Sequence, residues 1–145
     1  MKDYVIEKDF KVDGFRCVVV GQSRGFRCGY IEIPKDHILY EKEYDDVNVL
    51  VDVHGGWTYS EYGNDEYPVV SSKDSWWIGF DCAHLHDAID LELVKLFGEE
   101  NTKYNYDRLD NIIPDRVVKT TEYVENELID AVKQIDELKE EGDIK

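Results

Sequence analysis

The sequence has few basic residues. Its 145 residues include 17 Lys and Arg against 33 Asp and Glu, which gives a net charge of −16 and a pI near 4.5. So acidic a chain is repelled by the phosphates of nucleic acids and by anionic lipid, and no basic stripe offsets this repulsion. Binding to bulk nucleic acid or to a charged membrane surface is therefore excluded. The acidity either keeps the protein in solution or forms a surface that docks on a basic partner. Such a surface could imitate the charge of a nucleic acid.

Long apolar runs are also missing. No stretch is long enough to span a bilayer, and the opening residues MKDYVIEKDF lack the apolar core of a secretory signal peptide. We therefore expect no membrane partner and a cytoplasmic location.

Cysteine and proline are scarce, with three residues of each. Without a signal peptide, Cys17, Cys28 and Cys82 are expected to be reduced thiols, and no CxxC pair marks a structural zinc site. No linker rich in Pro, Gly or Ser divides the chain. Because 42% of the residues are hydrophobic, enough for a core, we expect one domain over residues 1–145.

Runs typical of β-strands fill the N-terminal two-thirds of the chain. Residues 14–20 and 25–33 share the word GFRC around a short glycine-containing loop, which predicts a β-hairpin. Valine recurs at every second position of VNVLVDV, so residues 47–53 are predicted to form a strand. Further strand regions are expected at residues 57–72 and 76–82, the second of which reads WWIGFDC.

Helical patterns follow the strands. Residues 86–98 are predicted to form a short helix, with Asp87 as an N-terminal charge or cap and Gly98 at its end. A long amphipathic helix is predicted to begin near Pro114. Its apolar or small residues recur in steps of four and three, at Val117, Thr121, Val124, Leu128, Ala131, Ile135 and Leu138. This stripe either packs across the sheet or forms a coiled-coil seam that joins copies of the chain into a homo-oligomer.

The order of strands first and helices last indicates an α+β fold rather than a parallel βαβ sheet. We expect a mainly antiparallel sheet over residues 1–85 and a helical part over residues 86–145.

Polar side chains gather where two predicted strands end. His54 follows residues 47–53, while Asp81 and His84 lie at the end of WWIGFDC. If the two strands are neighbours, the three side chains converge. Two imidazoles and one carboxylate are the ligands of many zinc and non-haem iron sites, and they can also form a general acid–base pair with an orienting carboxylate. His54, Asp81 and His84 are therefore candidate catalytic and metal-ligating residues, and the cofactor is either none or a divalent metal.

This candidate site has a structural alternative, in which His54 and His84 bond to the main chain at strand ends and Asp81 caps a turn or pairs with an arginine. The spacing matches no named motif. Neighbouring Asp52 is expected as a hydrogen-bond partner of His54 if the site is functional. Cys82 lies on the expected core face, which favours a buried thiol over a nucleophile.

The aromatic residues suggest a second kind of site. A planar, nucleotide-like ligand could stack on aromatic rings while an arginine holds its phosphate. The candidate ligand-binding residues are Arg16, Arg27, Tyr30, Trp57 and Trp77. The alternative is that the rings pack between sheet and helix and that each arginine forms a salt bridge.

Three stretches together resemble a family of small proteins, without an assigned activity, that are encoded in bacteriophage and bacterial genomes. They are GFRCGYIEIPKDHILYEKEYDD, VDVHGGWTYS and WWIGFDCAH, and the likeness runs from the predicted hairpin to Asp87. The matching words contain His37, His54, Asp81, Cys82 and His84. The chain departs from the family pattern at Ile38, where Pro is expected, at Glu41, where Gly is expected, and at His86, where a small residue is usual.

The resemblance implies a phage or prophage accessory protein that acts in the bacterial cytoplasm. Such a protein would bind and sequester a nucleotide-like signal or a host protein, and so blunt a defence response. A small hydrolase that uses His54, Asp81 and His84 is the first alternative, and a structural or interaction protein is the second.

Overall fold

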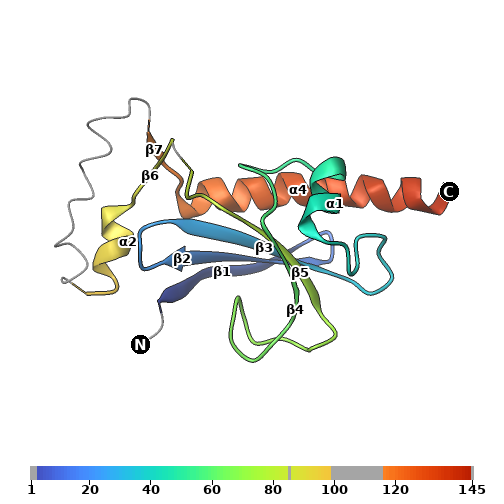
Figure 1. Ribbon diagram of the computed structural model, residues 1–145, viewed down its shortest axis with the longest axis horizontal. Coiled ribbons are helices and arrows are strands. Elements are labelled where there is room, and N and C mark those ends of the chain that lie inside the picture. The colour runs from blue at the N-terminus through green and yellow to red at the C-terminus, as the bar shows by residue number, and fades with distance from the viewer. Residues whose placement is uncertain (1–2, 85, 99–115, 145) are drawn as a thin grey trace.

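The computed structural model describes residues 3–84, 86–98 and 116–144, with side chains of the last helix described as far as residue 138. Five strands form the main sheet: β1 (Tyr4–Val12), β2 (Phe15–Gln22), β3 (Arg27–Ile33), β4 (Tyr59–Tyr62) and β5 (Trp76–Asp81). They lie in the order β1-β2-β3-β5-β4 and every neighbouring pair is antiparallel (Figure 1). The predicted α+β class and the hairpin of β2 with β3 are confirmed.

The remaining elements surround this sheet. They are the helices α1 (Tyr44–Leu50), α2 (Leu91–Lys95) and α4 (Thr121–Ile144), and the two-residue strands β6 (Asp87–Ala88) and β7 (Val117–Val118). β6 and β7 pair in parallel near the start of α4, with Asp87 opposite Val117 (Figure 1). This small pair fixes the position of Asp87 relative to the last helix.

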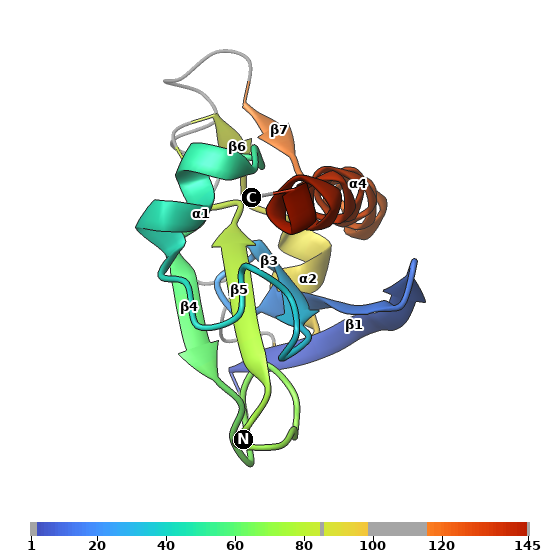
Figure 2. The ribbon, with the colours of Figure 1, turned by 90° about the vertical axis from the view of Figure 1, so that its right-hand side faces the viewer.

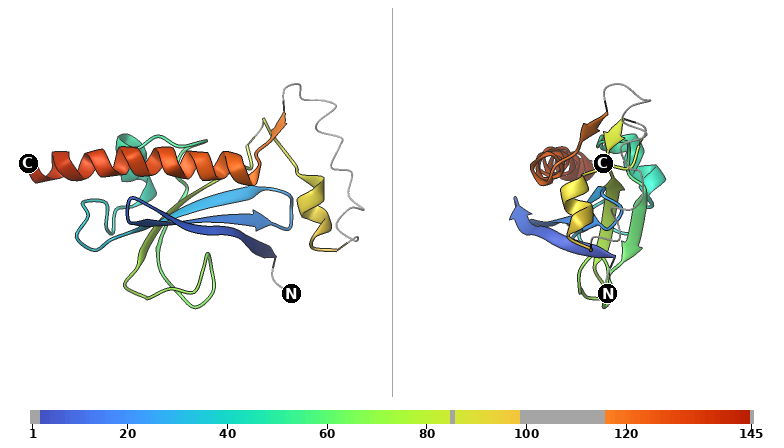
Figure 3. Two further views of the ribbon diagram at one scale, coloured as in Figure 1. Left: turned by 180° about the vertical axis from the view of Figure 1, so that it is seen from behind. Right: turned by 90° about the vertical axis from the view of Figure 1, so that its left-hand side faces the viewer.

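The long helix α4 packs on one face of the sheet, against β1, β2 and β3 (Figure 3). Thr120 begins it, because its hydroxyl accepts a hydrogen bond from the main-chain N–H of Tyr123 at 3.1 Å. The residues of its apolar stripe that are buried are Val124, Leu128, Ala131, Ile135 and Leu138. Packing across the sheet is thus confirmed. The same stripe is not available as an exposed coiled-coil seam, and oligomerisation through this helix stays a prediction.

The predicted start of this helix is wrong. Val117 lies in β7 and is exposed, and α4 begins at Thr121, after a short extended segment. Pro114 lies outside the described residues.

The predicted strand over residues 47–53 is also wrong, because most of it belongs to α1. Two acidic residues, Asp45 and Asp46, lie in the first turn of this helix, where they complement its dipole. Val47 and Val51 are buried four residues apart, whereas Val49 between them is 83% exposed. The burial follows the helical period, and the alternation of valines is incidental. Figure 2 shows α1 on the same side of the sheet as α4.

The helix predicted over residues 86–98 is much shorter. Only Leu91–Lys95 is helical, and its N-cap is Asp90, whose carboxylate accepts from the N–H groups of Glu92 and Leu93. Asp87 lies upstream in β6, so its predicted role as the helix cap or N-terminal charge is wrong. That correction leaves the carboxylate of Asp87 available for another role.

None of the helices in the described part of the chain has the length and apolar composition that a membrane span requires.

Candidate functional site

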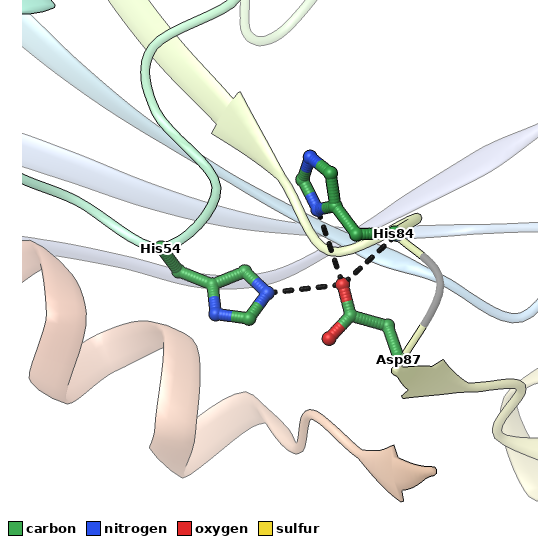
Figure 4. A group of neighbouring side chains, drawn as sticks. All are labelled: His54, His84 and Asp87. Atoms are coloured by element: carbon green, nitrogen blue, oxygen red, sulfur yellow. Dashed lines mark hydrogen bonds and ion pairs between the residues drawn. The ribbon is translucent and has the colours of Figure 1, made fainter.

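Three side chains from three separate segments meet at one end of the sheet (Figure 4). His54 follows the extended residues after α1, His84 follows β5, and Asp87 lies in β6. The Oδ2 atom of Asp87 is 2.9 Å from Nε2 of His54 and 3.2 Å from Nδ1 of His84. It also accepts the main-chain N–H of His84 at 3.0 Å. One carboxylate oxygen therefore joins both imidazoles.

Asp87 is held in place from the other side by basic residues near β7. Its side chain is only 2% exposed, and its Oδ1 atom is 3.2 Å from the ammonium of Lys119. Arg116 donates from Nη2 to the main-chain oxygen of Asp87 at 2.6 Å. A buried carboxylate is stable when it is paired and hydrogen-bonded in this way.

The charge state of Asp87 follows from these contacts. Burial acts to raise its pKa, but the hydrogen bonds from His54, from the main chain of His84 and from Lys119 outweigh burial. They hold the pKa of Asp87 below its ordinary value of 3.8. Asp87 is therefore an ionised carboxylate that can only accept hydrogen bonds.

Ionised Asp87 fixes which ring nitrogens carry hydrogen. His54 donates from Nε2 to Asp87, and its Nδ1 lies 2.9 Å from the Tyr123 hydroxyl. Burial, with nearby Glu127, raises the pKa of Tyr123, which keeps that hydroxyl protonated. His84 donates from Nδ1, and its Nε2 belongs to a side chain that is 39% exposed. Nε2 of His84 is thus the imidazole nitrogen of this group that makes no hydrogen bond to Asp87 or Tyr123.

Neighbouring residues hold the two rings. Glu127 on α4 accepts the main-chain N–H of His54 at 2.8 Å. Gly55 has a φ of +69°, and a Cβ there would overlap the imidazole of His84. The His84 ring lies directly against the backbone of Gly55, which only glycine permits.

The group has the composition of a metal centre. The side-chain ligand atoms of His54, His84 and Asp87 lie within 4.8 Å of one another. Two imidazoles and one carboxylate suit zinc, manganese or ferrous iron and leave further positions for water or substrate. The alternative chemistry needs no metal, because an imidazole oriented by a buried carboxylate is a general base.

The structure changes the membership of the predicted site. Asp81 is not at its centre: its Oδ1 atom is 3.9 Å from Nε2 of His84, and its oxygens accept from Thr58 and from the main chain of Ala83. Asp87 takes the central place. Asp52 does not support His54 as predicted, because Tyr123 and Asp87 occupy both ring nitrogens.

His37 and Cys82, two of the residues named with the sequence resemblance, have structural positions. His37 is buried, with Nε2 3.2 Å from the main-chain oxygen of Ile135 and Nδ1 accepting from the N–H of Leu39. Cys82 is buried, and burial raises the pKa of its thiol. The prediction that Cys82 is a core thiol rather than a nucleophile is confirmed.

The two arginines predicted to bind a ligand form salt bridges, as their alternative interpretation holds. Arg16 pairs with Asp9 at 2.7 Å. Arg27 is buried and pairs with Glu7 at 2.7 Å and with Asp90 at 2.9 Å, which connects β3 to β1 and to the cap of α2.

The three aromatic residues predicted to stack a ligand are core residues. Tyr30, Trp57 and Trp77 are each at most 4% exposed. Trp57 packs in the cluster between sheet and α4, whereas Tyr30 and Trp77 pack in the cluster on the opposite face of the sheet. They do not form one ligand site, and the alternative of aromatic packing is the correct one.

Searches of protein-family models, of curated proteins and of solved structures find no match to this chain.

Proposed function

We propose that the protein is a small hydrolase whose centre consists of His54, His84 and Asp87 around a divalent transition metal. The observation that carries this proposal is the single buried carboxylate oxygen of Asp87 within 3.2 Å of an imidazole nitrogen from each histidine. His84 and Asp87 lie in one turn, whereas His54 comes from a distant part of the chain, and bringing it to the buried carboxylate is costly because each group loses its water and its freedom.

Hydrolysis needs a base that takes a proton from water as the water oxygen attacks, and an acid that returns a proton to the leaving group. In a metal-free mode, His84 can serve both steps in turn through Nε2, with Asp87 holding its Nδ1 hydrogen. A metal at the three side chains would lower the pKa of bound water and polarise the substrate. The second candidate mode is metal-free, and it is favoured by the ion pair that Lys119 makes with Asp87, since this pair offsets the negative charge that would attract a metal.

The setting of this activity remains the one that the sequence resemblance implies: a phage-type accessory protein in the bacterial cytoplasm that counters a host defence. Hydrolysis of a signalling molecule would weaken the host defence, and sequestration of that molecule would have the same effect. Sequestration of a nucleotide-like signal or of a host protein therefore stays a prediction.

The proposal is tested by hydrolysis of chromogenic phosphodiesters and carboxylic esters, with and without a chelator. We expect the variant His84→Ala to lose about 100-fold or more of the rate, which is the usual size of a general acid–base contribution. His86→Ala is the matched control, because the side chain of His86 is exposed although the residue directly precedes Asp87 in the chain. Sensitivity to the chelator identifies the metal mode, and insensitivity the metal-free mode. Equal rates in the wild type and His84→Ala would refute the proposal.

A further inference from the structure

A cavity of about 360 Å³ lies next to the proposed centre. It is bounded by the turn between β2 and β3 and by the end of β5, and its lining consists of Gln22, Arg24, Phe26, Cys28, Asp81 and Ala83. This volume is at the small end of the range for small-molecule sites, about 300 to 1,000 Å³.

The cavity and the centre share a wall. Asp81, which lines the cavity, has its Oδ1 atom 3.9 Å from Nε2 of His84. Ala83, also in the lining, immediately precedes His84 in the chain. Asp81 therefore lies between the cavity and Nε2 of His84.

The lining offers three kinds of recognition. Arg24 is exposed and, among the described residues, has no ion-pair partner, unlike Arg16 and Arg27. A guanidinium matches a phosphate by two parallel hydrogen bonds. Phe26 provides an aromatic ring for a planar base. Asp81 keeps acceptor capacity for sugar hydroxyls, since a carboxylate has about four lone-pair sites and two of them are used.

The rim that carries Arg24 is held in one conformation. Gln22 donates to the main-chain oxygen of Phe26 at 2.8 Å, and Gly25 donates to that of Gln22 at 2.9 Å. Asp90 donates to the main-chain oxygen of Gly25 at 3.0 Å. Gly25 has a φ of +93°, and a Cβ there would overlap Ile89. A rim fixed in this way lowers the entropy cost of binding.

We propose that this cavity binds a nucleoside monophosphate or a phosphoester of that size, with its phosphate on Arg24, its base beside Phe26 and its sugar hydroxyls on Asp81. This inference does not rest on the proposed function, because the cavity can hold the ligand whether or not the His84 centre acts on it. Binding itself does not need the centre to be active. A nucleotide-like ligand was also the class that the aromatic residues and arginines of the sequence suggested. The cavity lies elsewhere in the fold than those residues.

The test is calorimetric titration of the full chain with adenosine monophosphate, with adenosine and with inorganic phosphate. The variants are Arg24→Glu, Arg24→Gln and His84→Ala, with Lys133→Glu as the matched control because Lys133 is exposed on α4 and the charge change is the same. We expect Arg24→Glu and Arg24→Gln to weaken binding of the nucleotide about 10- to 100-fold, as loss of a charge-assisted hydrogen bond does. Lys133→Glu should leave the affinity within a few-fold of the wild type, whereas His84→Ala tests hydrolysis alone, and thermal melting checks that all variants are folded.

The nucleotide should bind more tightly than adenosine and than phosphate alone. Three results would overturn the inference: no binding of the nucleotide, equal binding by the Arg24 variants, or equally tight binding of adenosine. Nucleotide binding that depends on Arg24 in a protein without hydrolytic activity would retain this inference and reject the proposed function. Ester hydrolysis that depends on His84, in a protein that binds no nucleotide, would do the reverse.

Discussion

Asp87 organises the centre as a single residue, since one of its oxygens bonds both histidines and the other pairs with Lys119. From the sequence alone, His54 and His84 could be predicted as members because each follows a strand-like run before glycine or polar residues. Asp87 was assigned to a helix terminus instead. An Asp three residues after a His could have indicated the bond, because residues at that spacing meet in a turn, but only the pairing of β6 with β7 gives Asp87 its orientation.

Gly55 should be essential for the position of His84. The variant Gly55→Ala introduces a Cβ into the imidazole of His84, and we expect it to reduce metal affinity or hydrolysis at least 10-fold. Gly14→Ala is the matched control, because Gly14 also has a positive φ, +87°, but a Cβ there meets nothing within 4 Å. Both variants carry backbone strain of about 1 kcal/mol. An equal loss of activity in both would show that strain alone, and not the contact with His84, is responsible.

Asp87 should also give the protein acid-dependent stability. Because its pKa is lower in the folded protein than its ordinary value of 3.8, the unfolded chain binds the proton first as the pH falls. The stabilisation is therefore fully present above about pH 4 to 5 and is lost as the pH falls through the lowered pKa. We expect Asp87→Asn to reduce the free energy of unfolding by about 1 to 3 kcal/mol at neutral pH, and the gap to the wild type to narrow in acid. Urea unfolding at a series of pH values measures this.

The control for that titration is Asp74→Asn, which removes a carboxylate whose side chain is 74% exposed. It should leave the free energy of unfolding nearly unchanged at every pH. If the difference in free energy of unfolding between Asp87→Asn and the wild type stayed constant down to pH 2, it would contradict an ionised Asp87 with a lowered pKa.

Among the elements, the long helix was the most predictable from the sequence and α1 the least. The stripe of α4 is long enough for its period to be read, and the sheet buries it as expected. Valine is common in strands, so the composition of residues 47–53 favours a strand. Only the burial of Val47 and Val51, four residues apart, shows the helical period, and the sequence does not reveal that burial. β1 escaped detection because it lies at the sheet edge, where Val5 and Ile6 are exposed and no clean alternation remains.

The packing of α4 on the sheet should dominate the stability of the fold. Leu128 is fully buried between α4 and the sheet, so Leu128→Ala should lower the free energy of unfolding by about 2 to 5 kcal/mol. Glu137→Ala is the control, because Glu137 is exposed on the same helix, and it should cost less than about 0.5 kcal/mol. Denaturant unfolding measures both, and a cost for Leu128→Ala close to that of the control would mean that the helix does not pack as described.

At the scale of the whole molecule, the reactivity of the three thiols shows whether solvent and reagents reach the core. Cys17, Cys28 and Cys82 are free and buried, and burial raises the pKa of each, that of Cys17 to about 12. We expect Cys17 and Cys82, which do not line the cavity beside β5, not to react with a thiol reagent such as dithionitrobenzoate within minutes at neutral pH, and all three thiols to react once the protein is unfolded in guanidinium. Rapid reaction of more than one thiol in the folded protein would place Cys17 or Cys82 at the surface.

The central claim is that His54, His84 and Asp87 form one metal centre, and metal binding by the intact protein tests it most directly. Zinc and manganese would be titrated into metal-free protein and the bound metal measured by elemental analysis after dialysis. The wild type and His86→Ala should each retain one metal per chain, whereas His54→Ala and His84→Ala should retain none while their circular dichroism spectra remain those of the folded protein. A wild type that retains no metal, or variants that retain as much as the wild type, would contradict the claim.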